Sequence, residues 1–499
     1  MRKKEFFEHM NDLHVAMTFD DVRLKTSYSE IMPDHVSTET KFSKNVPLKI
    51  PIVSAAMDTV TEHELAIELA KLGGIGIIHR NLNPEEQAFQ VARVKNHLNG
   101  LIENPICVNE EESINDILEK RNRKGYGFHT FPVLDKEGKL IGILTENDFD
   151  LCDNFSLPAK EVMTAQLITS PLGTTLEEAY NIMTKTKKKV LPLVNNDEKI
   201  SGMYVFSDVK RIKSESSQKY NIDARGQLRV GAAIGTGEDT LNRVKKLVKE
   251  NIDVVVIDTA HGDSKPVIET LKMIKEKYPS LDVVTGNVSE PDSVRRLIEA
   301  GSDGVKIGQG PGSICTTRVI AGVGCPQVTA IYNCSLVADE YGIPICADGG
   351  LRFSGDITIA IGAGAHCIML GSMLAGIEES PGEIVFWEGR QWKNYRGMGS
   401  IGAMQEHKGS RERYGQKDAG KEELIPEGVE GLVPYKGKLK DVIFQYVGGL
   451  KNGMGYVGAS TINELREKAD FMRLSVPGQA ESHPHHVKIT KESPNYSGA

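Results

Sequence analysis

A glycine-rich segment that ends in a cysteine, residues 308–318, holds the residues of this sequence best suited to covalent chemistry. It reads Gly-Gln-Gly-Pro-Gly-Ser-Ile-Cys-Thr-Thr-Arg. Three glycines and a proline within five residues cannot continue the apolar run before them, so the backbone must turn and leave N–H and C=O groups free for ligands. Hydroxyl groups and an arginine beside Cys315 favour the thiolate, which is the nucleophilic form. The alternative is a tight turn with an inert thiol.

Two further glycine segments follow apolar runs downstream, Asp348-Gly349-Gly350 and Gly371-Ser372. Backbone N–H groups at such glycines can hold a phosphate, with the Ser372 hydroxyl as an additional donor. The Asp348 carboxylate suits a ribose diol, because it can accept two hydrogen bonds. Together with the cysteine, these segments predict a nucleoside monophosphate site, although tight turns also favour glycine.

Eight short apolar runs provide the elements that would position these segments. Their continuous apolar character is typical of parallel strands covered on both faces, and the spacers between them show helical periodicity. The runs are residues 50–57, 73–79, 228–234, 253–258, 281–287, 303–308, 343–348 and 366–371. This pattern predicts the α/β class and a (β/α)8 TIM barrel, whose site lies where the strands end. Residues at or just after these ends are Met57, His79, Asp258, Asn287, Gly308, Asp348 and Gly371.

An internal repeat interrupts the barrel pattern between residues 94 and 215. The pattern Pro132…Gly142…Asp148 recurs sixty positions later as Pro192…Gly202…Asp208. A duplicated strand–turn–strand–helix unit would bury its apolar face against its twin. The pair resembles tandem CBS motifs, which implies a module that binds adenine or guanine nucleotides; a purely structural repeat is the alternative. The predicted domains are residues 1–93 and 216–499 for the barrel, and about 94–154 and 158–215 for the two repeats.

Residues 389–440 are rich in Gly, Lys, Glu and Arg, and residues 397–431 show little helix or strand periodicity. So long a segment in a compact enzyme is either disordered or a working lid. We expect a mobile flap over residues 400–431, with Arg413 and Tyr414 near its tip.

Composition narrows the class of protein. The formal net charge is −8, without a long basic cluster, so we expect small-molecule partners and no nucleic acid. No uncharged apolar run is long enough for a membrane span, and we expect a cytoplasmic protein. Seven cysteines without CxxC spacing indicate reduced thiols and no structural zinc.

The assembled motifs resemble the IMP dehydrogenase/GMP reductase family over essentially the full length. The resemblance rests on the split barrel, the inserted repeat, the Gly-Pro-Gly-Ser-Ile-Cys-Thr-Thr loop and the Arg-Tyr pair. It implies that a cysteine thiolate attacks C2 of IMP, that hydride passes to NAD⁺, and that water then releases XMP. Two alternatives remain: a related NADPH-dependent GMP reductase, which normally lacks the insertion and the Arg-Tyr pair, and a nucleotide-sensing protein whose barrel has lost catalysis.

The resemblance also implies residue roles. Cys315 would be the nucleophile and Arg413 the base for hydrolysis, with Thr317 and Tyr414 placing water. The residues that would hold IMP are Ser313, Asp348, Gly349, Gly350, Gly371, Ser372, Tyr395, Gly397, Met398, Gly399 and Glu427. The residues that would bind NAD⁺ are Asp258, Asn287, Gly308, Gln309 and Gly310.

A potassium ion and a homotetramer are implied in the same way. Carbonyl oxygens of Gly310, Gly312 and Cys315 would hold one side of the ion, and Glu481, Ser482 and His483 of a neighbouring subunit the other. Two positions depart from the family pattern: Asp263, which we expect to bring negative charge near the dinucleotide, and Leu432, where an arginine is common.

Overall fold

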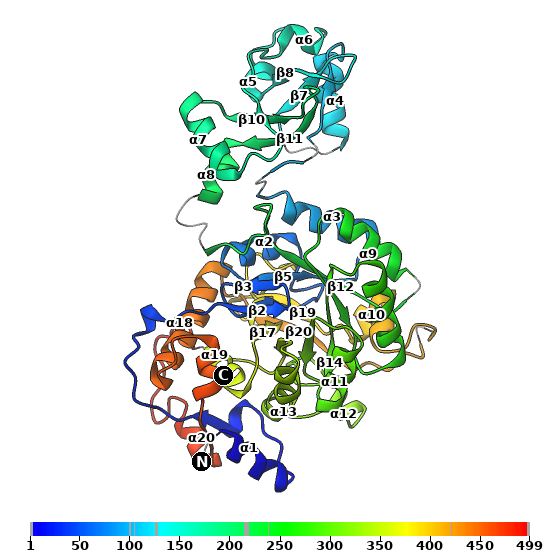
Figure 1. Cartoon of the computed structure of the whole chain (residues 1–499). Coiled ribbons are helices and arrows are strands. Elements are labelled where there is room, and N and C mark those ends of the chain that lie inside the picture. Colours follow the sequence, from blue (N-terminus) through cyan, green and yellow to red (C-terminus); the bar gives the residue numbers. More distant parts are fainter. Residues whose placement is uncertain are drawn as a thin grey trace. The chain divides into compact units, whose positions relative to one another are not determined.

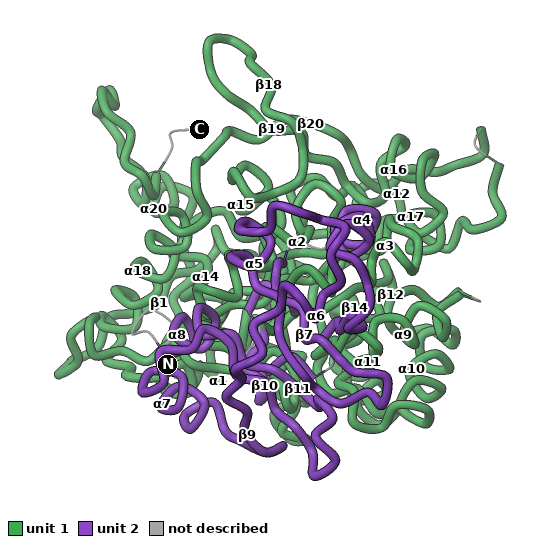
Figure 2. Tube along the Cα trace, turned by 90° about the horizontal axis from the view of Figure 1, so that it is seen from above, with its two compact units in different colours: residues 1–95, 219–221, 228–499 green, residues 96–218, 222–227 purple. Residues whose placement is uncertain are grey.

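The computed structural model describes residues 3–98, 101–103, 105–124, 128–213, 219–237, 239–420 and 422–496. The chain forms two compact units, coloured separately in Figure 2. Unit 1 comprises residues 1–95, 219–221 and 228–499, and unit 2 comprises residues 96–218 and 222–227. The predicted boundary at residue 215 lies outside the described residues.

Unit 1 contains the predicted closed barrel of eight parallel strands, which confirms the fold class (Figure 1). Each strand pairs with its two neighbours in parallel register. In spatial order the strands are β12 (Val230–Ile234), β13 (Val254–Asp258), β14 (Asp282–Val288), β15 (Gly304–Ile307), β16 (Ile345–Asp348), β17 (Cys367–Leu370), β4 (Ile52–Ser54) and β5 (Ile75–Ile78).

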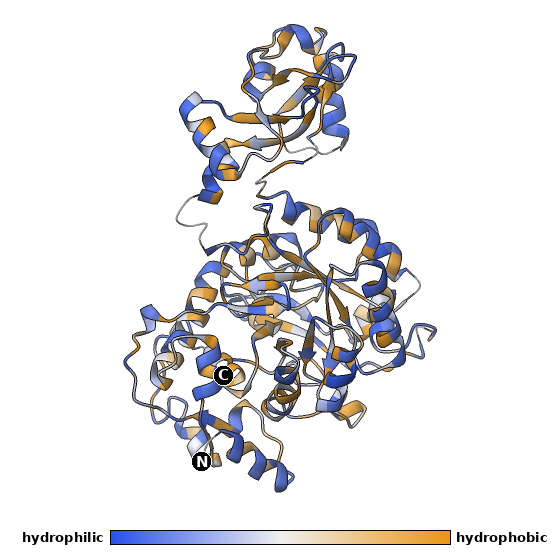
Figure 3. Ribbon diagram, viewed as in Figure 1, coloured by the Kyte–Doolittle hydropathy of each residue, from blue (hydrophilic) through white to orange (hydrophobic). Residues whose placement is uncertain are grey.

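The barrel strands are buried along almost their whole length because helices cover their outer faces. Figure 3 shows the hydrophobic strands inside and helices of mixed hydropathy outside. The helices between the strands are α2 (His63–Lys71), α3 (Pro84–Lys95), α9 (Thr240–Lys249), α10 (Lys265–Lys277), α11 (Pro291–Glu299), α13 (Gln327–Glu340) and α14 (Ser354–Ala363). Helices such as α9, α10 and α11 bury residues at three- and four-residue spacing, whereas α13 and α14 are buried along most of their length.

A hairpin of β2 (Thr40–Ser43) and β3 (Val46–Leu48) closes the amino-terminal end of the barrel. Its side chains Phe42, Val46 and Leu48 belong to the buried cluster that fills the barrel interior. Ser43 Oγ donates a hydrogen bond of 2.5 Å to Asp282 at the start of β14. The carboxyl-terminal end therefore remains available for a site.

The segment predicted to lack regular structure contains two short helices and part of a strand. α16 (Ile401–Glu406) and α17 (Lys408–Arg413) are six residues each, and β20 (Glu430–Pro434) pairs with β19 (Arg390–Arg396), which pairs with β18 (Ile384–Trp387). Helices of fewer than two turns are too short to display a periodicity that sequence can reveal.

The remaining elements of unit 1 surround the barrel. They are α1 (Lys3–Asp12), η1 (Phe19–Asp21), β1 (Val22–Leu24), η2 (Pro33–His35), α12 (Thr317–Ile320), α15 (Ser372–Ala375), α18 (Leu439–Val457), α19 (Ile462–Lys468), β21 (Phe471–Arg473) and α20 (Val476–Glu481). No helix among the described residues is long and apolar enough to span a membrane.

Unit 2 holds two similar halves, each with a three-stranded sheet and its own buried cluster. The first half contains β6 (Val108–Asn109), α4 (Ile114–Lys124), β7 (Phe131–Leu134), β8 (Leu140–Leu144), α5 (Glu146–Asp150) and α6 (Ala159–Val162). The second contains β9 (Ser170–Pro171), α7 (Leu176–Thr186), β10 (Val190–Val194), β11 (Ile200–Val205) and α8 (Phe206–Lys213). In both halves the repeated Pro and Gly lie on paired strands, and the repeated Asp lies in the helix that follows.

Candidate active site

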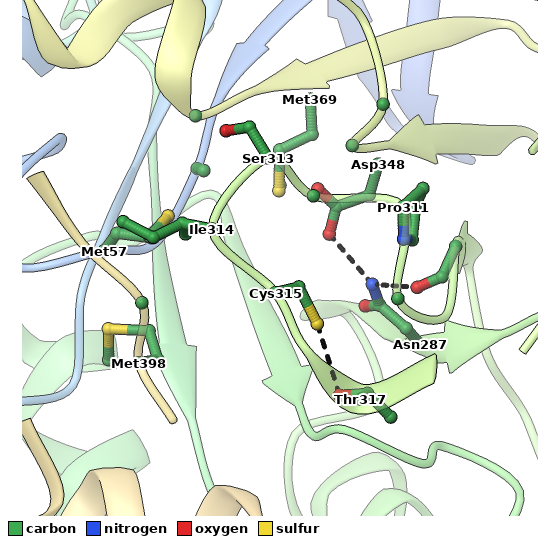
Figure 4. A pocket seen from close by; sticks show the side chains of 18 of the residues that line it. Met57, Asn287, Pro311, Ser313, Ile314, Cys315, Thr317, Asp348, Met369 and Met398 are labelled. Carbon is green, nitrogen blue, oxygen red and sulfur yellow. Dashed lines mark hydrogen bonds between the residues drawn. The ribbon is translucent and has the colours of Figure 1, made fainter. Parts of the chain in front are cut away.

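A pocket at the carboxyl-terminal end of the barrel brings together most of the residues selected from the sequence (Figure 4). Its lining includes all four predicted catalytic residues, every predicted IMP residue except Gly399, and every predicted cofactor residue except Asp258. Of the strand-end residues, His79 lies outside the lining, and its Nε2 is 3.3 Å from Glu62 Oε1. Segments from opposite ends of the chain thus converge on one cavity.

The cysteine loop is held open toward this pocket by backbone geometry. Gly308 and Gly310 have φ values of 145° and 75°, a region that side chains disfavour. Arg318 Nε donates a 3.0 Å hydrogen bond to the Gln309 carbonyl, and its Nη2 donates to the Cys325 carbonyl. The arginine therefore ties the start of the loop to the segment that follows α12.

Cys315 is half-buried and lies opposite Thr317, with 3.2 Å between Sγ and Oγ1 (Figure 4). A hydroxyl at this distance can exchange a hydrogen bond with the sulfur. The N–H groups of Thr316 and Val429 donate to the carbonyls of Glu427 and Ile314, each at 3.0 Å. The flap's carboxyl end and the cysteine loop thus form one wall.

The segment after β16 forms a neighbouring wall. Gly349 and Gly350 have φ values of 90° and 84°, and a Cβ on Gly349 would lie 3.1 Å from Pro311. The Asp348 carboxylate accepts a 3.0 Å hydrogen bond from Asn287 Nδ2 (Figure 4). Glycine is needed here both for backbone conformation and for close packing on the cysteine loop.

A third wall comes from the end of β17 and from β19. A Cβ on Gly371 would lie 3.0 Å from the Tyr395 hydroxyl, so the tyrosine packs against the turn that precedes Ser372. Burial raises the pKa of Tyr395, so this phenol stays protonated and can donate a hydrogen bond. Backbone N–H groups and two hydroxyls at one place are suited to a phosphate.

Lys306, on β15, is a buried residue that sequence reasoning missed. Its side chain is 1 % exposed, and its ammonium contacts Asp258, Asp348 and Asn287. The signal was present in the sequence: a lysine inside the apolar run Val305-Lys306-Ile307. A charge buried in a barrel strand requires partners, and these are residues of the proposed site.

The flap helix α17 packs over the pocket. Arg413 forms an ion pair with Asp258, and the Arg413 carbonyl accepts a 3.1 Å hydrogen bond from the Ala260 N–H. The Tyr414 ring lies against Gly399, where a Cβ would come within 2.6 Å of Cζ. Gly399 therefore packs directly against the tyrosine ring. Burial raises the pKa of Tyr414.

Residues after β5, also missed from the sequence, dock this helix. Arg80 Nη1 donates a 3.1 Å hydrogen bond to Glu412, and Asn81 Nδ2 donates one of 3.1 Å to the buried Ser410 hydroxyl. Burial lowers the pKa of Arg80 to about 10, so it remains charged at neutral pH. No pattern within either segment alone could reveal these contacts, because the partners are more than three hundred residues apart.

The predicted cation ligands lie in two places. Gly310, Gly312 and Cys315 belong to the cysteine loop, whereas Glu481 ends α20 and His483 Nδ1 lies 3.0 Å from the Tyr496 hydroxyl. Within the described ranges, no group of three or more His, Cys, Asp or Glu side chains is arranged to hold a metal ion.

The Asp263 carboxylate is compensated by a nearby positive charge. It accepts hydrogen bonds from Arg296 Nε at 3.0 Å and from Ser293 Oγ at 2.7 Å, and the Arg296 guanidinium holds its pKa below the usual range. Its negative charge is therefore paired with an arginine on α11.

Comparisons with known proteins show which family the chain resembles. A family model described as the IMP dehydrogenase / GMP reductase domain matches residues 16–485. The chain is 53% identical to the inosine-5′-monophosphate dehydrogenase of Aquifex aeolicus, covering 96% of this chain and 97% of that protein. Identity is 49% with the same enzyme of Halalkalibacterium halodurans and 48% with that of Bacillus subtilis, each covering 97% of this chain and 98% of the relative.

A solved structure is also similar over nearly the whole chain. It is a GMP reductase variant from Trypanosoma brucei in complex with guanosine 5′-monophosphate, with a TM-score of 0.85 and 39% identity over 95% of this chain and 98% of that one. This match covers more than unit 1 contains, so the insertion does not by itself distinguish the two activities, contrary to our sequence-based expectation. The chain belongs to the IMP dehydrogenase/GMP reductase family.

Proposed function

We propose that this chain oxidises IMP to XMP with NAD⁺, through a covalent bond between Cys315 and the purine. The observation that carries the proposal is the arrangement of the pocket: the Cys315 thiol and Thr317 lie in the same cavity as Arg413 and Tyr414 of the flap. The names and close similarity of the three bacterial relatives support the same activity.

The cysteine makes an otherwise difficult oxidation accessible. The thiolate adds to C2 of hypoxanthine, which becomes tetrahedral and can release hydride; the product is a thioimidate. When bound, NAD⁺ supplies the hydride acceptor. Water then adds to C2, the carbon–sulfur bond breaks, and XMP and the free thiol are released.

The walls of the pocket would hold the substrate in the orientation that this attack requires. Asp348 would accept the ribose hydroxyls, and the glycines at 349, 350 and 371 with Ser372 and Tyr395 would bind the phosphate. Ser313, Gly397, Met398, Gly399 and Glu427 would complete the IMP site.

The residues near the flap fit a dinucleotide. The Asp258 carboxylate, which lies outside the pocket lining and contacts Arg413, would accept hydrogen bonds from ribose hydroxyls, and Asn287 with the turn 308–310 lines the pocket. The same place suits the second half-reaction: Arg413 would remove a proton from water positioned by Thr317 and Tyr414. A guanidinium holds its proton tightly, so this role demands an unusual environment.

We also propose a potassium ion and a homotetramer. The proposed ligands suit a potassium ion because carbonyl oxygens are hard ligands. Carbonyls in a loop or at the carboxyl end of a helix accept no hydrogen bond from a following helical turn, so they are available to the ion. Gly310, Gly312 and Cys315 would hold the ion from one subunit, and Glu481, Ser482 and His483 from the next. The substrates are intracellular nucleotides, so we place the protein in the cytoplasm.

Unit 2 is proposed as a nucleotide-binding regulatory module. Its two halves have corresponding strands and helices, and Thr145 Oγ1 donates a 2.6 Å hydrogen bond to Asp148 at the start of α5. Deleting about residues 96–218 with a short linker should keep activity and remove any response to adenine or guanine nucleotides. A soluble, folded but inactive product would contradict this division of function.

One assay tests the reaction itself. Purified chain with IMP and NAD⁺ should form NADH and XMP in equal amounts. Reductive deamination of GMP with NADPH is the second candidate, favoured by the solved GMP reductase; it would consume NADPH and release ammonia and IMP. A chain that binds IMP but does neither would be the non-catalytic nucleotide sensor.

A further inference from the structure

Three side chains of the proposed site, Asp258, Asp348 and Asn287, contact the buried amine of Lys306. Lys306 lies on β15 opposite Gly286 of β14, where any Cβ would come within 2.6 Å of the lysine Cβ. Its side chain is among the largest fully buried ones in the described part of the chain. The lysine is therefore accommodated in the barrel wall by a glycine on the next strand.

The Lys306 ammonium has contacts on both sides. Nζ is 3.0 Å from Asp258 Oδ1 and 2.5 Å from Asp348 Oδ2, and it also donates to Asn287 Oδ1. Asn287 Nδ2 in turn donates to Asp348 Oδ2 at 3.0 Å and to the Gly308 carbonyl at 2.7 Å. One cation thus links the proposed cofactor carboxylate on β13, the proposed substrate carboxylate on β16 and the start of the cysteine loop.

The negative charges of Asp258 and Asp348 require a cation between them. Two carboxylates within hydrogen-bond distance of the same nitrogen would repel each other strongly in its absence, and one of them would take up a proton. A protonated carboxyl group is a weaker acceptor for a ribose hydroxyl than a carboxylate. Asp348, which is more exposed than Asp258, faces the pocket and has this task in the proposed IMP site.

We infer that Lys306 is a positioning residue: it keeps Asp258 and Asp348 ionised and correctly oriented, and thereby couples IMP binding to the state of the cofactor carboxylate. The inference rests on the proposed function. Other charged or titratable groups near this cluster are Arg413, which pairs with Asp258, the buried thiol of Cys346 on β16, and Tyr395 and Cys315 across the pocket.

The test measures IMP binding by calorimetry without cofactor, between about pH 6 and pH 8. The variants are Lys306→Gln, Lys306→Arg, Asp258→Asn and the double variant Asp258→Asn/Lys306→Gln. Each dissociation constant is divided by that of the intact chain at the same pH, which cancels the titration of the nucleotide phosphate. Thermal unfolding checks that each variant is folded.

Lys306→Gln should bind IMP at least about tenfold more weakly at pH 6, with a smaller loss at pH 8, because one carboxylate then carries a proton. Lys306→Arg, which keeps the charge, should recover much of the affinity. The double variant should lose most of the pH dependence, because Asp348 no longer faces a second carboxylate. If Lys306 were needed only for packing, replacing Asp258 would not restore the IMP affinity.

Unchanged, pH-independent IMP affinity in a folded Lys306→Gln variant would overturn the inference, as would a double variant no better than the single one. If Lys306→Gln does not fold, recovery of folding in the double variant supports the inference, and failure of both overturns it. Activity of the intact chain is measured separately. If the intact chain does not convert IMP to XMP, the proposed function fails whatever Lys306 does.

Discussion

Arg413 of the flap and Asp258 at the end of β13 form a buried ion pair, although they are 155 positions apart in the sequence. Asp258 also contacts Lys306 through its other carboxylate oxygen. The flap tip therefore occupies the carboxylate that we propose for the cofactor ribose. Because one oxygen cannot serve both partners in the same geometry, the flap and the dinucleotide would use this site in turn.

Replacing Arg413 by Ala should separate the two half-reactions. If the arginine serves hydrolysis, the variant should release about one NADH per site and then stall with nucleotide attached to Cys315. Rapid-quench detection of protein-bound nucleotide at saturating IMP and NAD⁺ measures this. Lys408→Ala, an exposed change on the same helix, is the control and should turn over normally. Normal turnover without a protein-bound nucleotide in the Arg413 variant would contradict the assignment of Arg413 as the hydrolytic base.

Cys315→Ala should abolish NADH formation yet bind IMP with nearly unchanged affinity, since other walls hold the ribose and phosphate. Calorimetry and absorbance measure the two effects. Cys325→Ala is a matched control: burial raises the pKa of Cys325 to about 11, so this thiol is not nucleophilic at neutral pH. Appreciable turnover by Cys315→Ala would rule out the covalent mechanism.

Gly399→Ala should slow hydrolysis more than hydride transfer. The added methyl group would lie 2.6 Å from the Tyr414 ring and must displace it. We expect at least a tenfold loss of kcat with adduct accumulation, since a displacement of about 1 Å at a catalytic group can cost about a hundredfold. Gly448→Ala, in α18 with open space around its Cβ, should have little effect. Equal rates in both variants would contradict a role for Tyr414.

Exchanging potassium for lithium at constant ionic strength should slow turnover. A much smaller ion cannot span carbonyl oxygens arranged for a larger one, so the cysteine loop would lose support. Initial rates in the two salts measure the effect, with sodium as an intermediate case. Identical rates in all three would remove the cation from the proposal.

Acid should destabilise the barrel unit partly through His366. Burial lowers the pKa of His366 from 6.5 to about 3, and its Nδ1 accepts a hydrogen bond from the Ile345 N–H. Below about pH 6.5 the unfolded chain therefore binds a proton that the folded chain does not, and the free energy of unfolding falls until about pH 3. His366→Gln should show a smaller drop in Tm between pH 7.5 and pH 5 than the intact chain. Exposed His35→Gln should keep the full drop; equal drops for all three would contradict this.

The barrel could be predicted because each strand carries its own local signal. Runs such as Val254–Asp258 are continuously apolar, and buried parallel strands require that. The helices α16 and α17 could not be predicted, because six residues do not display a period and their stability comes from packing on residues such as Asn81. The close contact of Gly399 with the Tyr414 ring could not be predicted either, because only the fold brings the two residues together.

The sequence by itself determined the barrel and the cysteine loop, because glycine turns and apolar periodicity act within a few residues. A residue such as Glu427 was expected at the pocket only from the family resemblance. Only the tertiary structure decided which charges meet. Lys306 reads as one lysine in an apolar strand until the barrel closes and brings Asp258 and Asp348 to it from two other strands. Arg413 likewise finds Asp258 only when the flap packs over the barrel. Electrostatic pairing depends on distance in space, and the order of residues along the chain does not encode that distance locally.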